Sequence, residues 1–405
     1  MVGSGDSPEG PWLGPTLVPP QVSAYLYPWD LVGDPHAVSR LVSAGFKHVT
    51  IAAAYHSVRA ATPQHPQHRF VVAKTAALYR PVRSGVWGGR RLSPLTASWT
   101  GSEDSFERAV EVFGASGLGV SAWVVLTHNS ALGRKRRDLV IRNCFGDSYE
   151  YALCPANAEV REYAALLVAE AVRDLPLEGI SLEAYGQLGA AHGGHHEKTV
   201  GAYTPLAEQV LSICCCDACQ RCWKAEGMDA GTTVRILQGA FEAAQCEAVG
   251  VDATPDHVLD APLAALLLAC RQLHTDALLE GVLAALRSAD PSLRITLHAQ
   301  PNPWATGASP GLTPTSARRA GAVLVPVEAT SPHSADAIAA ARRLVPASVS
   351  VAAYVNLLAP IEPDDFDEHA RRLLHAGADE LHLYHFGLAN RKQLPFFSRL
   401  ASLAS

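Results

Sequence analysis

The chain has 405 residues, of which 48% are hydrophobic and 18% charged, so it can bury a large core and is not disordered overall. A formal net charge of -6 excludes the strongly basic surface that is typical of nucleic-acid-binding proteins. No basic start followed by an apolar segment is present, and no stretch reaches the ~20 apolar residues of a membrane span, so we expect a cytoplasmic protein that binds neither nucleic acid nor a membrane.

Along residues 21–405, short apolar runs alternate with alanine-rich amphipathic segments, which is the pattern of parallel strands joined by helices. Residues 1–20 are expected to be disordered or extended. The predicted strands, in chain order, are 23–28, 48–55, 120–126, 179–182, 293–297, 322–327, 349–354 and 380–384. The best-defined predicted helix covers residues 157–173, where apolar residues recur at helical spacing. Eight such repeats predict a single (β/α)8 barrel.

Two long segments interrupt the alternation, at about 57–102 after the second strand and about 186–260 after the fourth. Loops of this length in a compact domain are usually functional. An open, doubly wound sheet would alternate in the same way. We favour a closed barrel because no Gly-x-Gly-x-x-Gly turn follows the first strand and because polar residues gather after the strands.

Polar or aromatic side chains follow the carboxyl ends of the predicted strands, where (β/α)8 enzymes carry their active sites. Each one alone can be a helix cap, a loop residue or simple packing, but together they predict a substrate site. The predicted substrate-binding residues are Asp30, His56, His128, Asn129, Tyr185, His195, His196, His298, Trp304, Tyr354, Asn356, Tyr384 and His385. The aromatic members offer faces on which a sugar ring can stack. The histidines at 195 and 196 can equally belong to a polar, glycine-rich loop.

Two carboxylates directly follow hydrophobic strands in the middle of the barrel, Glu183 after the fourth strand and Glu328 after the sixth. Glycoside hydrolysis uses two such groups, one protonated to assist the leaving oxygen and one ionised to attack or to activate water. Since these two strands lie on the same side of a barrel, we expect the two carboxylates to face each other across a sugar. The alternative is that each glutamate pairs with an arginine or caps the next helix.

Four segments carry a resemblance to a known group of proteins. Residues 153–163 read LCPANAEVREY, 177–183 read LEGISLE, 213–219 read ICCCDAC and 383–388 read LYHFGL. They resemble the LCP..PEVREY, DGI.LD and CFC..C motifs, and the closing strand, of mostly uncharacterised glycoside-hydrolase-like TIM-barrel proteins. The resemblance implies a barrel in which Glu183 is the catalytic nucleophile or base and Glu328 a candidate acid. This chain differs from the group by having Glu in place of Asp at 183.

The cysteines are unevenly distributed, since five of the nine fall between residues 214 and 222. A tetrahedral zinc site needs four ligands, often with two to four residues between paired cysteines. The spacing predicts Cys214, Cys216, Cys219 and Cys222 as ligands of a structural zinc ion. Reduced, buried thiols that pack a loop are the alternative.

The sequence therefore predicts a glycoside hydrolase that acts on a small carbohydrate or glycoside through Glu183 and Glu328 and requires no cofactor for its chemistry. Two other functions fit the same residues. One is a carbohydrate-binding barrel without catalytic activity. The other is a metal-dependent barrel enzyme, similar to a sugar isomerase, with Glu183, His298 and Glu328 as ligands. The substrate and the oligomeric state are not predicted.

Overall fold

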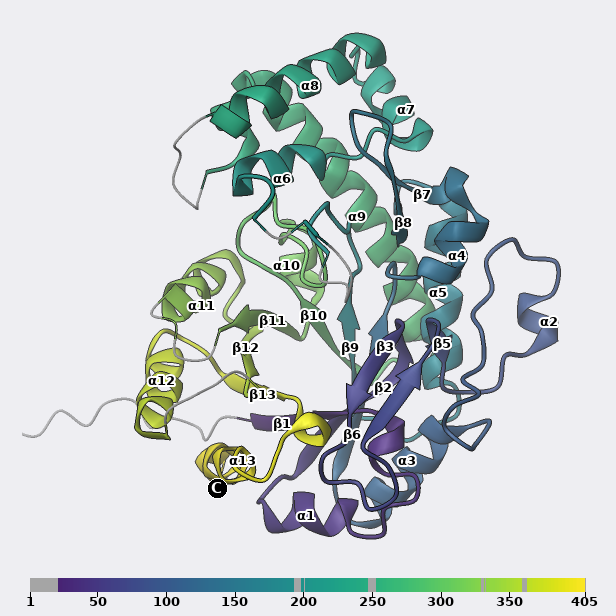
Figure 1. Ribbon diagram of the computed structural model, residues 1–405, viewed down its shortest axis with the longest axis vertical. Coiled ribbons are helices and arrows are strands. Elements are labelled where there is room, and N and C mark those ends of the chain that lie inside the picture. Colours follow the sequence, from purple (N-terminus) through teal and green to yellow (C-terminus); the bar gives the residue numbers. More distant parts are fainter. Residues whose placement is uncertain are drawn as a thin grey trace, which may run out of the picture.

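The centre of the molecule is a closed sheet of eight parallel strands (Figure 1). The computed structural model describes residues 21–192, 198–199, 201–246, 253–328, 331, 333–358 and 363–404, so the predicted N-terminal segment 1–20 lies outside the described residues. The barrel strands are β1 (Gln21–Leu26), β2 (His48–Tyr55), β6 (Gly119–Val125), β9 (Gly179–Glu183), β10 (Arg294–His298), β11 (Ala322–Val327), β12 (Ser350–Asn356) and β13 (Glu380–Tyr384). Each strand pairs with the next in this order, and β1 also pairs with β13, which closes the ring. The predicted (β/α)8 barrel is confirmed.

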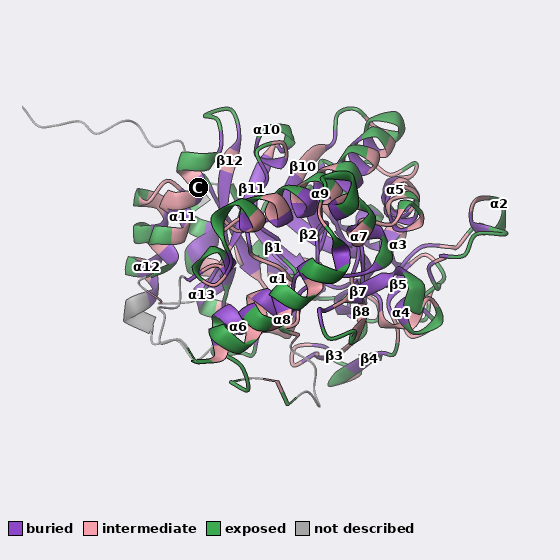
Figure 2. Cartoon of the chain, turned by 90° about the horizontal axis from the view of Figure 1, so that it is seen from above, coloured by how far each residue is buried: buried purple, intermediate pink, exposed green. Residues whose placement is uncertain are grey.

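An α-helix follows each barrel strand, and these helices form the outer layer. They are α1 (Ala37–Ser43), α3 (Ser105–Ala115), α5 (Ala158–Val172), α9 (Ala261–Ala289), α10 (Ser316–Arg319), α11 (His333–Leu344), α12 (Pro363–His375) and α13 (Leu394–Ala401). Figure 2 shows buried strands inside and helices with exposed outer faces. Every residue of β2 is buried, as expected for a strand that is covered on both sides. Among the described residues, no helix has the length and apolar content needed to cross a membrane.

The helix boundaries follow from capping residues in the sequence. Asp104 precedes α3, and its carboxylate accepts the backbone N–H of Glu107, while Asp260 does the same for Leu263 at the start of α9. Gly377 follows the end of α12 with a φ of +104°, a conformation that favours glycine. These caps set where the long helices begin and end.

Three excursions extend the barrel at the carboxyl ends of its strands. After β2 come β3 (Val58–Ala61), β4 (Phe70–Ala73), β5 (Ala77–Leu78) and α2 (Ser84–Trp87). After β6 come α4 (Ser130–Lys135), β7 (Val140–Arg142) and β8 (Ser148–Leu153), and after β9 come α6 (Pro205–Leu211), α7 (Asp217–Ala225) and α8 (Ala230–Cys246). The sequence pattern does not predict the excursion after β6, because its strands are short and one of them contains only three residues.

The remaining turns of helix are short 3₁₀ segments at loop corners. They are Pro28–Asp30, Arg137–Leu139, Pro255–His257, Phe386–Leu388 and Ser402–Ala404.

The half of the barrel interior that lies toward the amino ends of the strands, called the lower interior below, is polar. Barrel interiors are usually filled by branched apolar residues. Here the hydroxyl of Ser23 bonds to Thr50 Oγ1 at 2.8 Å and to His48 Nδ1 at 2.9 Å. Glu380 bonds to Arg294, with Nη1 at 3.0 Å from Oε2, and to His382 Nε2 at 3.1 Å. The lower interior is therefore held by hydrogen bonds and an ion pair.

Candidate active site

A cleft of about 560 Å³ opens at the carboxyl ends of the barrel strands. Its lining comes from the ends of β2, β6 and β9, from the β3–β4 hairpin and from the loop after β10. The lining residues are His56, Ser57, Val58, Arg59, Val72, Ala73, Lys74, His128, Ser130, Glu183, Leu188, Ala191, His192, Gly307 and Ala308. Its position matches the face on which (β/α)8 enzymes carry their active sites.

Glu183 is the last residue of β9 and the only carboxylate among the described residues that line this cleft. The side chain points into the barrel, and its Oε2 accepts a hydrogen bond of 2.8 Å from the indole N–H of Trp123. Burial raises the pKa of Glu183 to about 7, although the bond from Trp123 acts in the opposite direction. The carboxyl is thus able to hold or release a proton near neutral pH.

The backbone immediately after Glu183 is in an uncommon conformation. Ala184 has a φ of +54°, a region that residues with a Cβ seldom adopt. Its N–H donates to Ala308 O at 2.8 Å, and its carbonyl accepts from the Thr127 backbone N–H at 3.1 Å and from the Thr127 hydroxyl at 2.7 Å. Strained residues of this kind persist where the surroundings hold them, and they cluster at functional sites. These three bonds fix the direction in which β9 presents Glu183.

Three imidazoles line the cleft beside the carboxylate. The rings of His56 and His128 stack at a centroid distance of 4.4 Å, and His128 Nε2 lies 3.0 Å from His192 Nε2. The His192 ring in turn stacks on Tyr151 at 4.0 Å. Burial lowers the pKa of His56 to about 4 and lowers that of His128 further. Both are therefore neutral at pH 7. Because the Nδ1–H of His56 donates to Ser57 O at 2.8 Å, its Nε2 is left as a hydrogen-bond acceptor.

An aromatic layer lies beneath the cleft and accounts for several predicted substrate-binding residues. The ring of Tyr25 is 4.9 Å from Tyr354 and 5.0 Å from Trp123, and Tyr354 lies 5.5 Å from Tyr384. Further members of this layer are His298, which bonds to Ser181 Oγ at 2.9 Å, and His385, which stacks on Tyr27 at 4.2 Å. None of the predicted members of this layer lines the described cleft.

Other predicted residues have local structural contacts. Asn129 caps α4, since its side chain accepts the N–H of Leu132, and the Asn356 side chain accepts the N–H of Leu358. The Asp30 carboxylate accepts the N–H of Tyr27 at 2.8 Å. Tyr185 and Trp304 are also buried and lie outside the cleft lining. His195 and His196 lie outside the described residues.

Glu328 does not share the cleft that Glu183 lines. It follows β11, on which Leu324 and Pro326 are in register with the inward-facing His298 and Tyr354. Continued alternation would turn residue 328 inward as well, but β11 ends at Val327 and Glu328 is exposed. The expected pair of facing carboxylates is therefore not found among the described residues of the cleft.

Sequence reasoning missed Trp123, Arg59 and Lys74. Trp123 lies inside β6 rather than at its end. Side chains two residues apart on a strand face the same side, so the polar Ser121 could have indicated that Trp123 also faces the barrel interior. Arg59 and Lys74 belong to the excursion after β2, where Arg59 lies over the Phe70 ring at 4.5 Å from the ring centroid. Long irregular segments give no periodicity from which such positions can be assigned.

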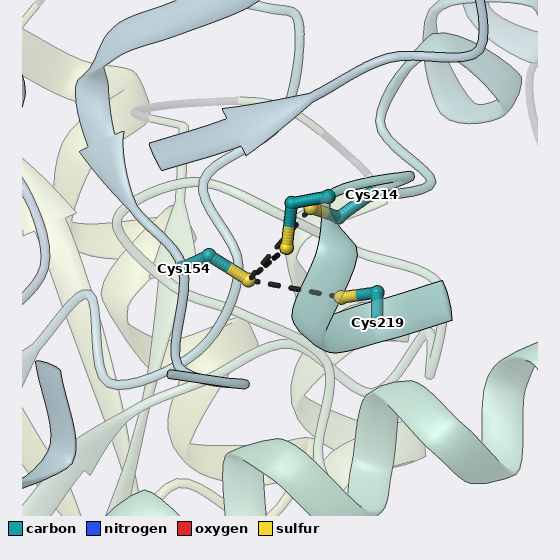
Figure 3. Close-up of side chains that lie close together, drawn as sticks. Cys154, Cys214 and Cys219 are labelled. Atoms are coloured by element: carbon teal, nitrogen blue, oxygen red, sulfur yellow. Dashed lines mark hydrogen bonds between the residues drawn. The ribbon is translucent and has the colours of Figure 1, made fainter. Parts of the chain in front are cut away.

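A second cluster, the tetrathiol cluster, consists of Cys154, Cys214, Cys216 and Cys219. Figure 3 shows how Cys214 and Cys219 face Cys154. All four are buried, and their sulfur atoms lie within 4.8 Å of one another. The fourth member differs from the prediction, because Cys222 lies outside the cluster and its Sγ is 2.9 Å from that of Cys270. Cys154 was missed because it follows β8, far from the other three in sequence.

The tetrathiol cluster is the only group of three or more potential metal ligands in common reach among the described residues. The alternative metal site of Glu183, His298 and Glu328 is therefore not assembled. His298 bonds instead to Ser181, and Glu328 is exposed.

Comparison with known proteins shows that this chain resembles others in fold but not in sequence. No protein-family model and no curated protein matches the sequence. Among solved structures, the glycoside hydrolase domain of PgaB (BpsB) from Bordetella bronchiseptica aligns with a TM-score of 0.60 at 12% identity, covering 96% of this chain and 99% of that one.

Two larger enzymes align as well. The α-L-fucosidase isoenzyme 2 from Paenibacillus thiaminolyticus has a TM-score of 0.53 at 12% identity, covering 95% of this chain and 49% of that one. The β-galactosidase from Bacillus circulans sp. alkalophilus has a TM-score of 0.54 at 11% identity, covering 95% and 56%. This chain thus spans about half the length of these two enzymes. Its fold is the TIM barrel found in glycoside hydrolases.

Proposed function

We propose that this protein hydrolyses glycosidic bonds and that Glu183 is its general acid. The observation that supports the proposal is a buried carboxyl, with a pKa of about 7, that lines a cleft together with three histidines. A general acid is most effective when its pKa is close to the working pH, and glycosidases raise a carboxyl pKa by burial for this purpose. The resemblance implied a nucleophile or base at this position, but a carboxyl that holds its proton near neutral pH suits the acid role better.

Glu328 is the second carboxylate of the proposal. Glu328 is exposed and does not line the cleft, so whether it contributes to hydrolysis must be tested separately. If Glu328 does not take part, a neutral imidazole of the cleft, such as His56, is the group that can accept a proton from water.

The experiment is a hydrolysis assay with a panel of aryl glycosides. The panel includes α-L-fucosides and β-galactosides, because two of the solved neighbours are named for these activities. It also includes glucuronides, because Arg59 and Lys74 are the cations of the cleft lining. With the best substrate, Glu183→Gln should lower kcat by about 10²- to 10⁴-fold. A matched control is Glu178→Gln, immediately before the start of the same strand, which should retain full activity. Full activity of Glu183→Gln would overturn the proposal.

A carbohydrate-binding barrel without catalysis is the second candidate. The observation that favours it is that the described cleft contains a single carboxylate, whereas glycosidases generally use two. Calorimetric binding of an oligosaccharide by the wild type, without any turnover of that oligosaccharide, would support this function over hydrolysis.

A further inference from the structure

We propose that Cys154, Cys214, Cys216 and Cys219 bind one zinc ion, and that this ion joins the two loops that form one wall of the cleft. This wall, called the histidine wall below, consists of His128 and Ser130 after β6, and Leu188, Ala191 and His192 after β9. The proposal does not depend on any catalytic activity of the protein.

The sulfur geometry fits tetrahedral zinc. Cys154 Sγ lies 3.7 Å from the sulfur atoms of Cys214, Cys216 and Cys219. Four thiolates at the usual zinc–sulfur distance of about 2.3 Å occupy the corners of a tetrahedron whose edges measure about 3.8 Å. A disulfide would instead require sulfur atoms about 2.05 Å apart. The observed separations therefore leave room for an ion at the centre.

The chain presents the four sulfurs from two separate elements. Cys214, Cys216 and Cys219 form a Cys-x-Cys-x-x-Cys turn at the start of α7, and Cys154 follows β8 (Figure 3). The intervening Cys215 does not join them, since its Sγ lies 3.6 Å from the carbonyl of Ile213. Three ligands from one turn and a fourth from a distant strand make a closed structural site, because no ligand position is left for substrate.

Charge complementarity gives a second, independent indication of a bound metal thiolate. Four thiolates around one Zn²⁺ carry a net charge of about -2, which is costly to bury without a counter-charge. Arg271 of α9 is 7% exposed and donates to the carbonyls of Trp304 and Ser212 at 2.8 and 3.2 Å. Among the described residues Arg271 pairs with no carboxylate, and its bond to Ser212 O places the guanidinium beside the chain two residues before Cys214.

Hydrogen bonds connect the tetrathiol cluster to the histidine wall on both sides. Gln187, in the loop after β9, directs its amide nitrogen toward Cys219 Sγ at 3.8 Å and precedes Leu188 of the wall. On the other side, Tyr151 of β8 lies three residues before Cys154. Its hydroxyl donates to Gly189 O at 2.7 Å, and its ring stacks on His192. An ion that joins α7 to the end of β8 would therefore hold His192 in its place beside His128.

The first test measures metal in the full-length protein purified with zinc in the medium. Elemental analysis should find one zinc per chain, and cobalt exchanged into the site should show thiolate-to-cobalt charge transfer and tetrahedral ligand-field bands. Cys154→Ser and Cys219→Ser should lose the metal, whereas the matched controls Cys222→Ser and Cys144→Ser should retain it. If the ligand variants do not fold, the zinc content and the cobalt spectrum of the wild type still show whether the tetrathiol cluster binds a metal ion. Wild-type protein without zinc, or cobalt spectra without thiolate bands, would overturn the site.

The second test addresses the link to the cleft. After the zinc has been removed with a chelator, hydrogen exchange should accelerate at 148–154 and 186–192 and remain unchanged in β11 and β12. Unchanged exchange in the two wall segments would show that the ion does not hold the histidine wall, even if it binds.

Discussion

The indole N–H of Trp123 donates a hydrogen bond of 2.8 Å to Glu183 Oε2, and the exposed fractions of the two residues are 1% and 6%. The two residues lie on adjacent strands, β6 and β9. The bond stabilises the ionised carboxylate while burial disfavours it, and burial is the stronger effect on the pKa. The balance between the two can therefore be changed at Trp123 without altering the carboxyl itself.

Trp123→Phe is expected to raise the pKa of Glu183, because it removes the one hydrogen bond that lowers this pKa. If Glu183 acts as an acid, its protonated form is the active one, so the alkaline limb of the kcat/KM profile should shift to higher pH. A pH–rate profile of the variant measures the shift. Phe46→Leu, a change in the loop before β2 where Phe46 packs on Phe386, should lower stability without moving the profile.

Glu183→Gln should change how stability depends on pH. The Glu183 carboxyl has a usual pKa of 4.5, reached in the unfolded chain, and a pKa of about 7 when folded. Below pH 4.5 both states are protonated. As the pH rises from 4.5 to 7, only the unfolded state ionises, so the folded protein loses about 3 kcal/mol of stability. The variant lacks this loss, so the stability of Glu183→Gln relative to the wild type should be about 3 kcal/mol greater at pH 8 than at pH 4.5.

Urea denaturation of the wild type and Glu183→Gln at the two pH values measures this difference. Glu328→Gln is the control, since Glu328 is exposed and its replacement should give parallel curves. An identical response of the wild type and Glu183→Gln to pH would contradict the raised pKa.

Glu380 should have the opposite pH dependence. Burial alone would raise the pKa of Glu380, but the bonds and charges of His382 and Arg294 outweigh it and lower the pKa to about 2. The resulting stability is present above pH 4.5 and is lost as the pH falls toward 2. Glu380→Gln should therefore be destabilised by about 2–3 kcal/mol at pH 7, because it loses the bonds to Arg294 and His382 while Arg294 stays partly solvated. Acid titration of the folded fraction should show the wild type losing this advantage below pH 4.5.

Tyr151→Phe should weaken carbohydrate binding by several-fold with little change in fold. The hydroxyl of Tyr151 holds the loop at Gly189, and its ring supports His192 in the cleft. Tyr149→Phe is the matched control on the same strand, since its hydroxyl bonds to Leu211 O at 3.0 Å, away from the cleft lining. Calorimetric titration of both variants compares the affinities, and equal losses in the two would argue against a role for the histidine wall in binding.

The barrel could be predicted because each strand is a short apolar run with a helix after it. β2, β11 and β13 begin and end where the sequence predicts, since buried parallel strands read as unbroken apolar segments. Glu183 was found by the same reasoning, because strand ends face the cleft in this fold. The β7–β8 hairpin and its Cys154 were not predicted, because short strands in long excursions have no usable periodicity.

The sequence did not allow us to predict which strand-end side chains line the cleft and which pack against other residues. His298 and Tyr384 end their strands as expected, whereas β12 continues past Tyr354 to Asn356. All three rings pack against Tyr25, Trp123 or one another below the cleft. Asn129 and Asn356 likewise satisfy backbone N–H groups. Whether a polar residue at a strand end meets solvent or a neighbour depends on loops that are distant in sequence.

Closure of the barrel by β1 and β13 has a consequence for biosynthesis. Gln21 is paired with Glu380, so the first strand keeps an open edge until the last one has emerged from the ribosome. Contacts this far apart in sequence slow folding, and unpaired edges promote association with other chains. The nascent protein should accordingly depend on chaperones until translation is nearly complete, and truncation before β13 should yield aggregates rather than a smaller folded unit.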